Sequence, residues 1–136
     1  MSRITVVVFC VALIASACAD PTAPAAPTSV VPTVTDTFTG TLTPLATNSH
    51  PFVVSEIGGV KVTLTSVDPL VKLAIGIGTP STTTGTCAVI TSMITDPGAT
   101  PQLSGTATVK GNYCVAVSDP GNVTDTAAYT ITVLHS

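Results

Sequence analysis

The sequence predicts an all-β protein in which a single antiparallel β-sandwich of about eight strands follows a signal peptide and a disordered linker. From residue 37 onwards, apolar residues recur at every second position in short runs, which is the period of a half-buried strand. Pairs of Gly, Pro, Asp and Asn separate these runs at intervals of about 8 to 15 residues, as turns between strands do. Val, Ile and Thr, which favour strands, are abundant, and no segment has the period of an amphipathic helix.

The first four predicted strands cover residues 37–42, 51–56, 60–65 and 71–77. The first reads TFTGTL, in which Phe and Leu alternate with threonines, and the second reads PFVVSE. The third, VKVTLT, alternates strictly between apolar and polar residues and is therefore a half-buried strand. In the fourth, VKLAIGI, the apolar side chains again fall on alternate positions. Gly-Gly, Asp-Pro and Thr-Pro pairs supply the turns between and after them.

The last four predicted strands cover residues 87–94, 103–109, 112–117 and 127–134. The final one reads AAYTITVL, so its Tyr, Ile and Val point to one side and its two threonines to the other. Asp-Pro-Gly, Gly-Asn and Asp-Pro-Gly-Asn sequences mark the turns. We expect about four inward residues from each strand, which is enough for one shared core.

The N-terminus carries the features of an export signal that ends at a lipidated cysteine. Arg3 supplies a positive charge, and the uncharged run that follows is about 14 residues long, too short to span a bilayer. Residues 15–17 are the small residues that a signal peptidase requires, and Cys18 follows at once. This arrangement resembles a bacterial lipobox, with Ala15 where Leu is more usual. The interpretation is a signal peptide over residues 1–17, with Cys18 as the acylated anchor in the membrane.

Residues 18–35 are predicted to be a linker, because four prolines lie among Ala, Thr and Ser between residues 20 and 34. Proline lacks the N–H of a strand ladder and favours extended polyproline II. A segment of 15 such residues would reach roughly 45 Å. It is either a spacer that lifts the domain off the membrane or a leader whose length is not selected. The β-sandwich is then assigned to residues 36–136.

Composition excludes some classes of function. Only 8% of the residues are charged, the net charge is −3, and the chain has four Lys plus Arg. Nucleic-acid binding requires a basic patch, so it is not expected. The mature chain would have about 119 residues, which is one domain.

The four cysteines have different predicted fates. Cys10 lies in the apolar run of the signal and would be removed, and Cys18 is the acylation site. Cys87 and Cys114 remain in the folded part, where an isolated pair in an oxidising compartment indicates a disulfide. A metal site is the alternative, but two cysteines without neighbouring His or acidic residues are a poor ligand set. No metal and no cofactor are predicted.

The C-terminal part resembles a known family. Residues 111–117, GNYCVAV, followed by residues 129–133, YTITV, are similar to the ending of bacterial pre-peptidase C-terminal (PPC) domains. Upstream, the Phe52-Val-Val run and the GVKVTL run of residues 59–64 resemble the opening strands of that family. The likeness covers roughly residues 36–136. It implies a jelly-roll-like β-sandwich that accompanies exported enzymes as a non-catalytic accessory module. The chain differs from relatives that bind calcium, because it is poor in loop carboxylates.

The acidic residues are spread along the chain rather than clustered. Four aspartates of the folded part stand singly in turns: Asp68, Asp96, Asp119 and Asp125. Calcium requires six to eight oxygen ligands, several of them anionic, and no local spacing offers them. We therefore expect these aspartates to form turns rather than to bind a metal.

No catalytic motif is present in the sequence. His50 precedes a proline and is predicted to lie in a turn, and His135, beside the C-terminus, is predicted to be solvated. Glu56 is the only glutamate and is predicted to end a strand, so a paired-carboxylate site is not indicated. G-x-S-x-G, G-x-G-x-x-G, the P-loop and H-E-x-x-H are all missing. The protein is therefore not expected to be an enzyme.

Threonines and aromatic residues raise two further hypotheses. Threonine occupies every second position from Thr33 to Thr43, and such a row could order water as in ice-binding proteins. The alternative is that Thr is the ordinary solvent-facing strand residue of a chain that avoids charge, on a sheet whose twist spoils a flat array. Glycan sites use exposed aromatics, whereas the aromatics here lie in phase with apolar strand residues and are predicted to be core: Phe38, Phe52, Tyr113 and Tyr129.

These observations predict an exported, lipid-anchored, non-catalytic β-sandwich that serves binding or adhesion at the cell envelope. Its expected partners are the membrane, through the N-terminal lipid, and an envelope or extracellular protein or glycan. The alternative is a structural component of the envelope that pairs with another protein through its sheet edges. Ice or glycan binding by a threonine-rich sheet face is a more remote alternative.

Overall fold

The computed structural model describes residues 30–136, and this part of the chain contains eight β-strands and no helix. Each of the eight runs predicted from the sequence is a strand, so the all-β prediction is confirmed. The strands are β1 (Val34–Leu42), β2 (Thr47–Val54), β3 (Gly58–Asp68), β4 (Leu73–Pro80), β5 (Cys87–Thr95), β6 (Leu103–Ala107), β7 (Gly111–Ser118) and β8 (Ala127–His135).

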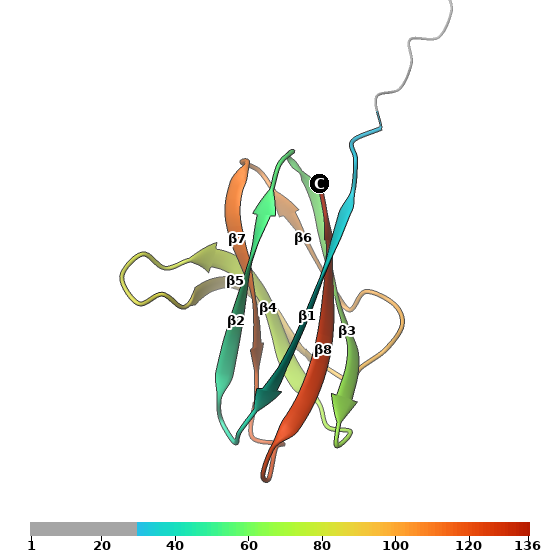
Figure 1. The fold of residues 1–136 in the computed structure, drawn as a ribbon, viewed down its shortest axis with the longest axis vertical. Coiled ribbons are helices and arrows are strands. Elements are labelled where there is room, and N and C mark those ends of the chain that lie inside the picture. The colour runs from blue at the N-terminus through green and yellow to red at the C-terminus, as the bar shows by residue number, and fades with distance from the viewer. Residues whose placement is uncertain (1–29) are drawn as a thin grey trace, which may run out of the picture.

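The strands form two four-stranded antiparallel sheets that pack face to face (Figure 1). The first sheet has the order β1-β8-β3-β6 and the second the order β2-β7-β4-β5. Most connections therefore cross from one sheet to the other, and only β4 and β5 are consecutive neighbours in one sheet. This is the strand order of an eight-stranded jelly roll, so the jelly-roll-like sandwich expected from the resemblance is confirmed.

The core lies between the sheets and is made by residues at alternate strand positions. The largest fully buried side chains include Leu42, Leu64, Leu73, Ile75 and Ile131. Along β8 the apolar side chains face inward and the threonines lie between them, because successive strand residues point to opposite faces. Full burial of such aliphatic side chains stabilises by about 1.5–3 kcal/mol each, so this layer dominates folding.

The N-terminal boundaries differ from those predicted. β1 begins at Val34, which pairs with His135 of β8, two residues before the predicted start of the domain. β2 begins at Thr47, four residues earlier than expected, and runs through His50 and Pro51. The sequence suggested a turn there because of the proline. However, β2 is an edge strand, and an edge tolerates proline because one side of its ladder needs no N–H donor.

The predicted signal peptide, Cys18 and most of the predicted linker lie outside the described residues. Within residues 30–136, no helix is long and apolar enough to cross a membrane.

Candidate functional site

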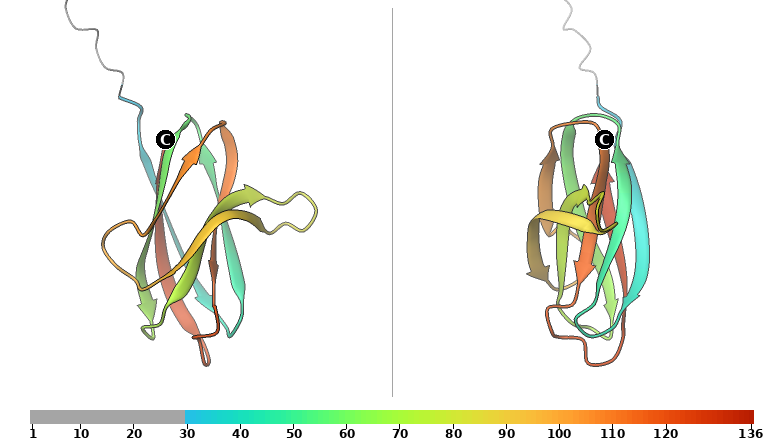
Figure 2. Two further views of the ribbon diagram at one scale, coloured as in Figure 1. Left: turned by 180° about the vertical axis from the view of Figure 1, so that it is seen from behind. Right: turned by 90° about the vertical axis from the view of Figure 1, so that its left-hand side faces the viewer.

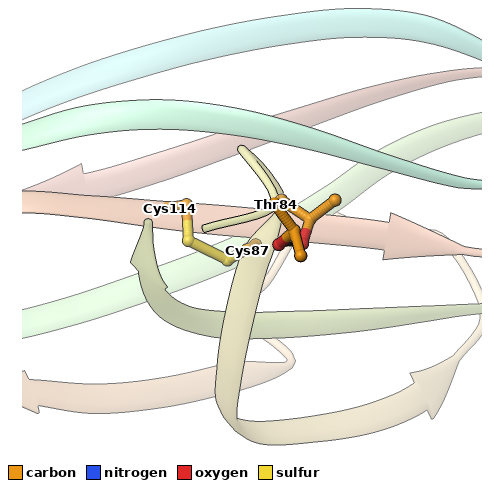
Figure 3. The surroundings of a disulfide bond; sticks show 4 residues. Thr84, Cys87 and Cys114 are labelled. Carbon is orange, nitrogen blue, oxygen red and sulfur yellow. Dashed lines mark hydrogen bonds between the residues drawn. A yellow bond between two sulfur atoms is a disulfide. The ribbon is translucent and has the colours of Figure 1, made fainter. Parts of the chain in front are cut away.

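A disulfide joins Cys87, at the start of β5, to Cys114 in β7 (Figure 3). The Cα atoms are 5.7 Å apart, within the usual range for a disulfide. Cys114 is buried and Cys87 is half-buried, so the bond attaches the start of an outer strand to the middle of the sheet. The predicted pairing of these two cysteines is confirmed.

The disulfide holds the β4–β5 hairpin, which leaves the side of the sandwich (Figures 1 and 2). No residue of β5 is buried: Cys87 and Thr95 at its ends are half-buried, and the seven residues between them are exposed. The expectation that every strand supplies inward residues is therefore wrong for β5. Ile90 is 73% exposed and Ile94 is 56% exposed, which is unusual for isoleucines in a strand.

Two glycines in β4 allow the backbone of β5 to lie close to the backbone of β4. A β-carbon on Gly78 would lie 2.0 Å from the backbone oxygen of Ala88, and one on Gly76 would lie 2.7 Å from a methyl group of Val89. The ladder also shifts register between Ile77 and Gly78, which is a bulge that bends the hairpin away from the core. Gly76 lies within the alternating strand predicted over residues 71–77, and Gly78 lies just beyond its predicted end. Gly at alternate positions of a strand is the signal that could have revealed a close backbone approach.

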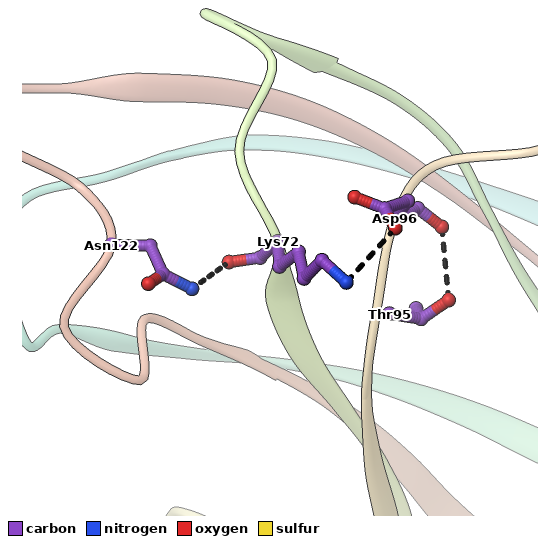
Figure 4. A network of polar contacts seen from close by, with 4 residues as sticks. All are labelled: Lys72, Thr95, Asp96 and Asn122. Carbon is purple, nitrogen blue, oxygen red and sulfur yellow. Dashed lines mark hydrogen bonds and ion pairs between the residues drawn. The ribbon is translucent and has the colours of Figure 1, made fainter.

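Polar contacts join the two ends of the β4–β5 hairpin that lie away from its turn (Figure 4). Lys72, just before β4, forms an ion pair of 3.3 Å with Asp96, just after β5. The amide of Asn122, in the turn before β8, donates to the backbone oxygen of Lys72 at 2.9 Å. Both charged groups are largely exposed, so the ion pair contributes at most about 1 kcal/mol and mainly aligns the two ends.

A second set of polar and aromatic side chains lies where β1 of the first sheet and β2 of the second sheet are neighbours. His50 Nε2 lies 2.7 Å from the hydroxyl of Tyr129, and its ring stacks on Phe38 with centroids 4.9 Å apart. The amide of Asn48 donates to the same hydroxyl at 3.0 Å. Gly40 of β1 leaves space for the ring of Tyr129, because a β-carbon on Gly40 would lie 2.5 Å from the Tyr129 hydroxyl oxygen. His50 is thus a packed strand residue, and the prediction that it lies in a turn is wrong.

Burial favours the neutral form of both rings. Desolvation lowers the pKa of His50 below its ordinary value. Desolvation also raises the pKa of Tyr129, partly opposed by the hydrogen bond from Asn48. Asn48 donates to the hydroxyl oxygen of Tyr129, and the same hydroxyl shares a second hydrogen bond with His50 Nε2, in which the tautomer of the imidazole decides the donor.

His135 is also enclosed, contrary to the prediction that it is solvated. It is 3% exposed, its Nε2 lies 2.9 Å from a carboxylate oxygen of Asp36, and its ring lies against Phe52 with centroids 5.0 Å apart. The reason is the pairing of β8 with β1, which carries the C-terminal strand into the sheet as far as His135. Proximity to a chain end was therefore a misleading signal.

Neither histidine of residues 30–136 forms a hydrogen bond with a serine or cysteine side chain. His50 bonds to a tyrosine, and His135 contacts the backbone oxygen of Ser136 rather than its hydroxyl. Glu56 forms an ion pair of 2.7 Å with Lys110 at the surface, in the turn before β3. No group of three or more His, Cys, Asp or Glu that could hold a metal occurs in residues 30–136.

Asp119 acts as a turn former, as predicted. Its carboxylate accepts from the backbone N–H groups of Leu45, Gly121, Asn122 and Val123 at 2.7–3.1 Å. Desolvation alone would raise the pKa of this carboxyl, but the four backbone donors outweigh it and hold the pKa below its ordinary value. The contact with Leu45 ties the β7–β8 turn to the β1–β2 turn.

We expect Asp119→Asn to lower the melting temperature at neutral pH and to change little in acid. A carboxylate whose folded pKa is lowered stabilises the fold above its unfolded pKa of about 3.9, and that stabilisation is lost as the pH falls through the folded value. Thermal unfolding from pH 7 down to roughly pH 2 would therefore show the gap between wild type and variant closing at low pH. Asp125→Asn, an exposed aspartate of the same turn, is the control. A gap that stays constant over this range would contradict the assignment.

The outer face of the first sheet carries rows of hydroxyl groups. Thr37 of β1 pairs with Thr132 of β8, which pairs with Thr63 of β3, and Thr39 pairs with Thr130. A bulge between Leu64 and Ser66 shifts the register on β3, so the rows do not continue as a regular lattice. A shallow depression of about 450 Å³ lies over this face, with Asp68 at its rim.

The four aromatic residues that were predicted to be core are packed as expected. Phe52, Tyr113 and Tyr129 are buried, and Phe38 is half-buried against the core. They offer no aromatic platform for a sugar ring.

No family model matches this sequence, and comparison with curated proteins gives no match. Among solved structures, the fold is similar to that of PliG from Aeromonas hydrophila, a periplasmic lysozyme inhibitor of g-type lysozyme. The similarity has a TM-score of 0.51 at 14% sequence identity and covers 73% of this chain and 83% of PliG. At this identity the comparison shows that the two chains share a β-sandwich fold.

Proposed function

We propose that this protein is an exported, lipid-anchored, non-catalytic module that binds another protein at the cell envelope through its β4–β5 hairpin. The observation that carries the proposal is β5 itself. Its apolar side chains are exposed although the core is complete without them. Exposed apolar clusters on an otherwise ordinary surface mark sites of protein interaction.

Two further points support a protein as the ligand. PliG, whose fold is similar, is a periplasmic protein that inhibits a lysozyme. The resemblance of residues 36–136 to PPC domains implies an accessory module beside exported enzymes and belongs to the same proposal. Both are consistent with a sandwich that acts by contact rather than by catalysis.

The hairpin is tested by cross-linking in the envelope, followed by recovery of the protein with an antibody. We expect the wild-type chain to be recovered in a cross-linked complex and Ile90→Lys to lose most of it, because a lysine in an edge strand blocks pairing. Ile57→Lys is the matched control, since Ile57 is 58% exposed but lies in the turn between β2 and β3. Equal complex formation by both variants would contradict the hairpin as the binding element. A hydrolytic activity that is lost on changing His50 or Glu56 would contradict a non-catalytic role.

Membrane attachment is tested separately by Cys18→Ser. If Cys18 carries the lipid, the variant should move from the membrane fraction to the soluble fraction, because the signal run is too short to anchor the chain by itself. The measurement is the distribution of the protein between membrane pellet and supernatant. Unchanged retention in the pellet would reject the anchor and leave the hairpin proposal intact.

A further inference from the structure

One end of the sandwich gathers exposed apolar side chains around the point where the chain enters it. Figure 1 shows that β1 begins at the end where the β2–β3 turn, the β6–β7 turn and the C-terminal residue lie. Six apolar residues at this end are between 43% and 87% exposed, and we call them the entry-end patch: Val30, Val31, Val34, Val53, Ile57 and Val109. Exposed apolar residues that gather in one place, rather than singly, indicate a surface that contacts something apolar.

Contacts between distant segments bring the patch together. Val31 of the entering chain and Ile57 of the β2–β3 turn line the same groove of about 310 Å³. Glu56 and Lys110 form an ion pair of 2.7 Å, which joins the β2–β3 turn to the β6–β7 turn that carries Val109. The entering chain and two turns that are far apart in the sequence therefore contribute to one surface.

We propose that the entry-end patch docks into the interface of the lipid bilayer to which the chain is anchored. This inference rests on the proposed function, in which Cys18 carries the lipid, and adds the orientation of the domain. Only residues 19–29 separate Cys18 from Val30, and a chain of that length spans at most roughly 40 Å when fully extended. The tether leaves from the patch itself, so contact with the bilayer is intramolecular, and a short linker gives an effective concentration in the millimolar range. A weak apolar contact is then sufficient for docking.

The charges of the entry end suit a lipid surface. Lys61 lines the groove and forms no ion pair within residues 30–136. Asp36 lies 2.9 Å from His135 Nε2, and Glu56 is the partner of Lys110. A free lysine beside exposed apolar residues is the combination with which interfacial protein surfaces contact anionic headgroups.

The opposite end of the sandwich does not have this combination. Leu45 and Leu70 are 76% and 75% exposed there, but three aspartates share that end, in or beside the turns after β3 and β7: Asp68, Asp119 and Asp125. Anionic headgroups repel carboxylates, so this end is expected to face away from the bilayer. The β4–β5 hairpin leaves the side of the sandwich (Figure 2), so docking of the entry end leaves the hairpin accessible to a protein partner.

Single tryptophans test this orientation, because the chain contains no Trp of its own. Ile57→Trp places one in the patch, and Leu70→Trp is the matched control at the opposite end. Each lipidated chain is reconstituted in vesicles of phosphatidylethanolamine and phosphatidylglycerol, with and without brominated acyl chains. Bromine should quench at least about half of the emission of Ile57→Trp, since docked apolar groups lie about 5–10 Å into the headgroup and acyl boundary, and should leave Leu70→Trp unchanged. Adding Val109→Asp to Ile57→Trp should remove most of the quenching, because a carboxylate is costly to desolvate and is repelled by phosphatidylglycerol.

Each outcome decides the proposal. Quenching of Ile57→Trp alone, lost with Val109→Asp, supports docking of the entry end. Equal quenching of both tryptophans, quenching of neither, or quenching that persists with Val109→Asp would overturn the docking, while flotation of the chain with the vesicles would show that the anchor stands. A chain that does not float with the vesicles would reject the anchor, and the docking that rests on it would fail as well. An undocked chain remains attached through Cys18, so Ile57→Lys still serves as the control for the hairpin.

Discussion

Replacing both Cys87 and Cys114 with alanine should lower the free energy of unfolding by about 3–4 kcal/mol. The bond closes a segment with a sequence separation of 27, so its loss enlarges the conformational freedom of the unfolded chain. In addition, no side chain of β5 is buried, so the folded hairpin depends on this bond and on its ladder with β4. The loss should therefore appear both in global stability and in local opening of the hairpin.

Denaturant unfolding of the exported Cys18→Ser chain measures the global effect, and hydrogen exchange of residues 87–95 measures the local one. Reduction by dithiothreitol is the control, because it should destabilise the parent and leave the double alanine variant unchanged. A change below about 1 kcal/mol would show that the hairpin is held mainly by its backbone ladder, contrary to the expectation from loop closure.

A side chain at Gly78 should destabilise the protein by about 2–3 kcal/mol, even in the smallest case, Gly78→Ala. The new β-carbon would lie 2.0 Å from the backbone oxygen of Ala88, and a backbone atom cannot turn aside as a flexible side chain does. The two strands of the hairpin would have to separate, which breaks the ladder beside the disulfide.

The matched control is Gly59→Ala, also in a strand, where a β-carbon would meet nothing within 4 Å. It should be neutral or slightly stabilising, because alanine restricts the unfolded chain more than glycine does. Thermal unfolding of the two variants distinguishes a local clash from the general effect of replacing glycine. Equal melting temperatures for Gly78→Ala and the parent would mean that β5 does not lie against β4 as described.

The two histidines show where a local interpretation fails. A histidine before proline and a histidine at a chain end are both common at surfaces, and nothing in their neighbours indicates otherwise. Their burial comes from contacts made by residues distant in the sequence: His50 with Tyr129, and His135 with Asp36. Only the packing of β1 against β2 and β8 brings these groups together.

The same limit applies to β5. Its composition predicts a strand correctly, and its disulfide follows from the compartment and from the absence of other partners. Inward residues were nevertheless expected from this strand as from the others, whereas β5 lies outside the core, close against the glycines of β4 and with a bulge at its own Ile90. Whether an apolar face is covered depends on what lies opposite, and that is a property of the assembled sheets.

The amino-acid sequence alone was enough to predict four features: the eight strands, the inward aromatic residues, the Asp119 turn and the Cys87–Cys114 pair. These features follow from strand period, turn chemistry and cysteine number, all of which act over a few residues or depend on residue type. The strand order, the enclosed histidines and the unpaired β5 edge arise only once the two sheets pack. They depend on contacts between segments far apart in the sequence. The free energy of these contacts arises only when both segments are in place, so it cannot be inferred from either segment alone.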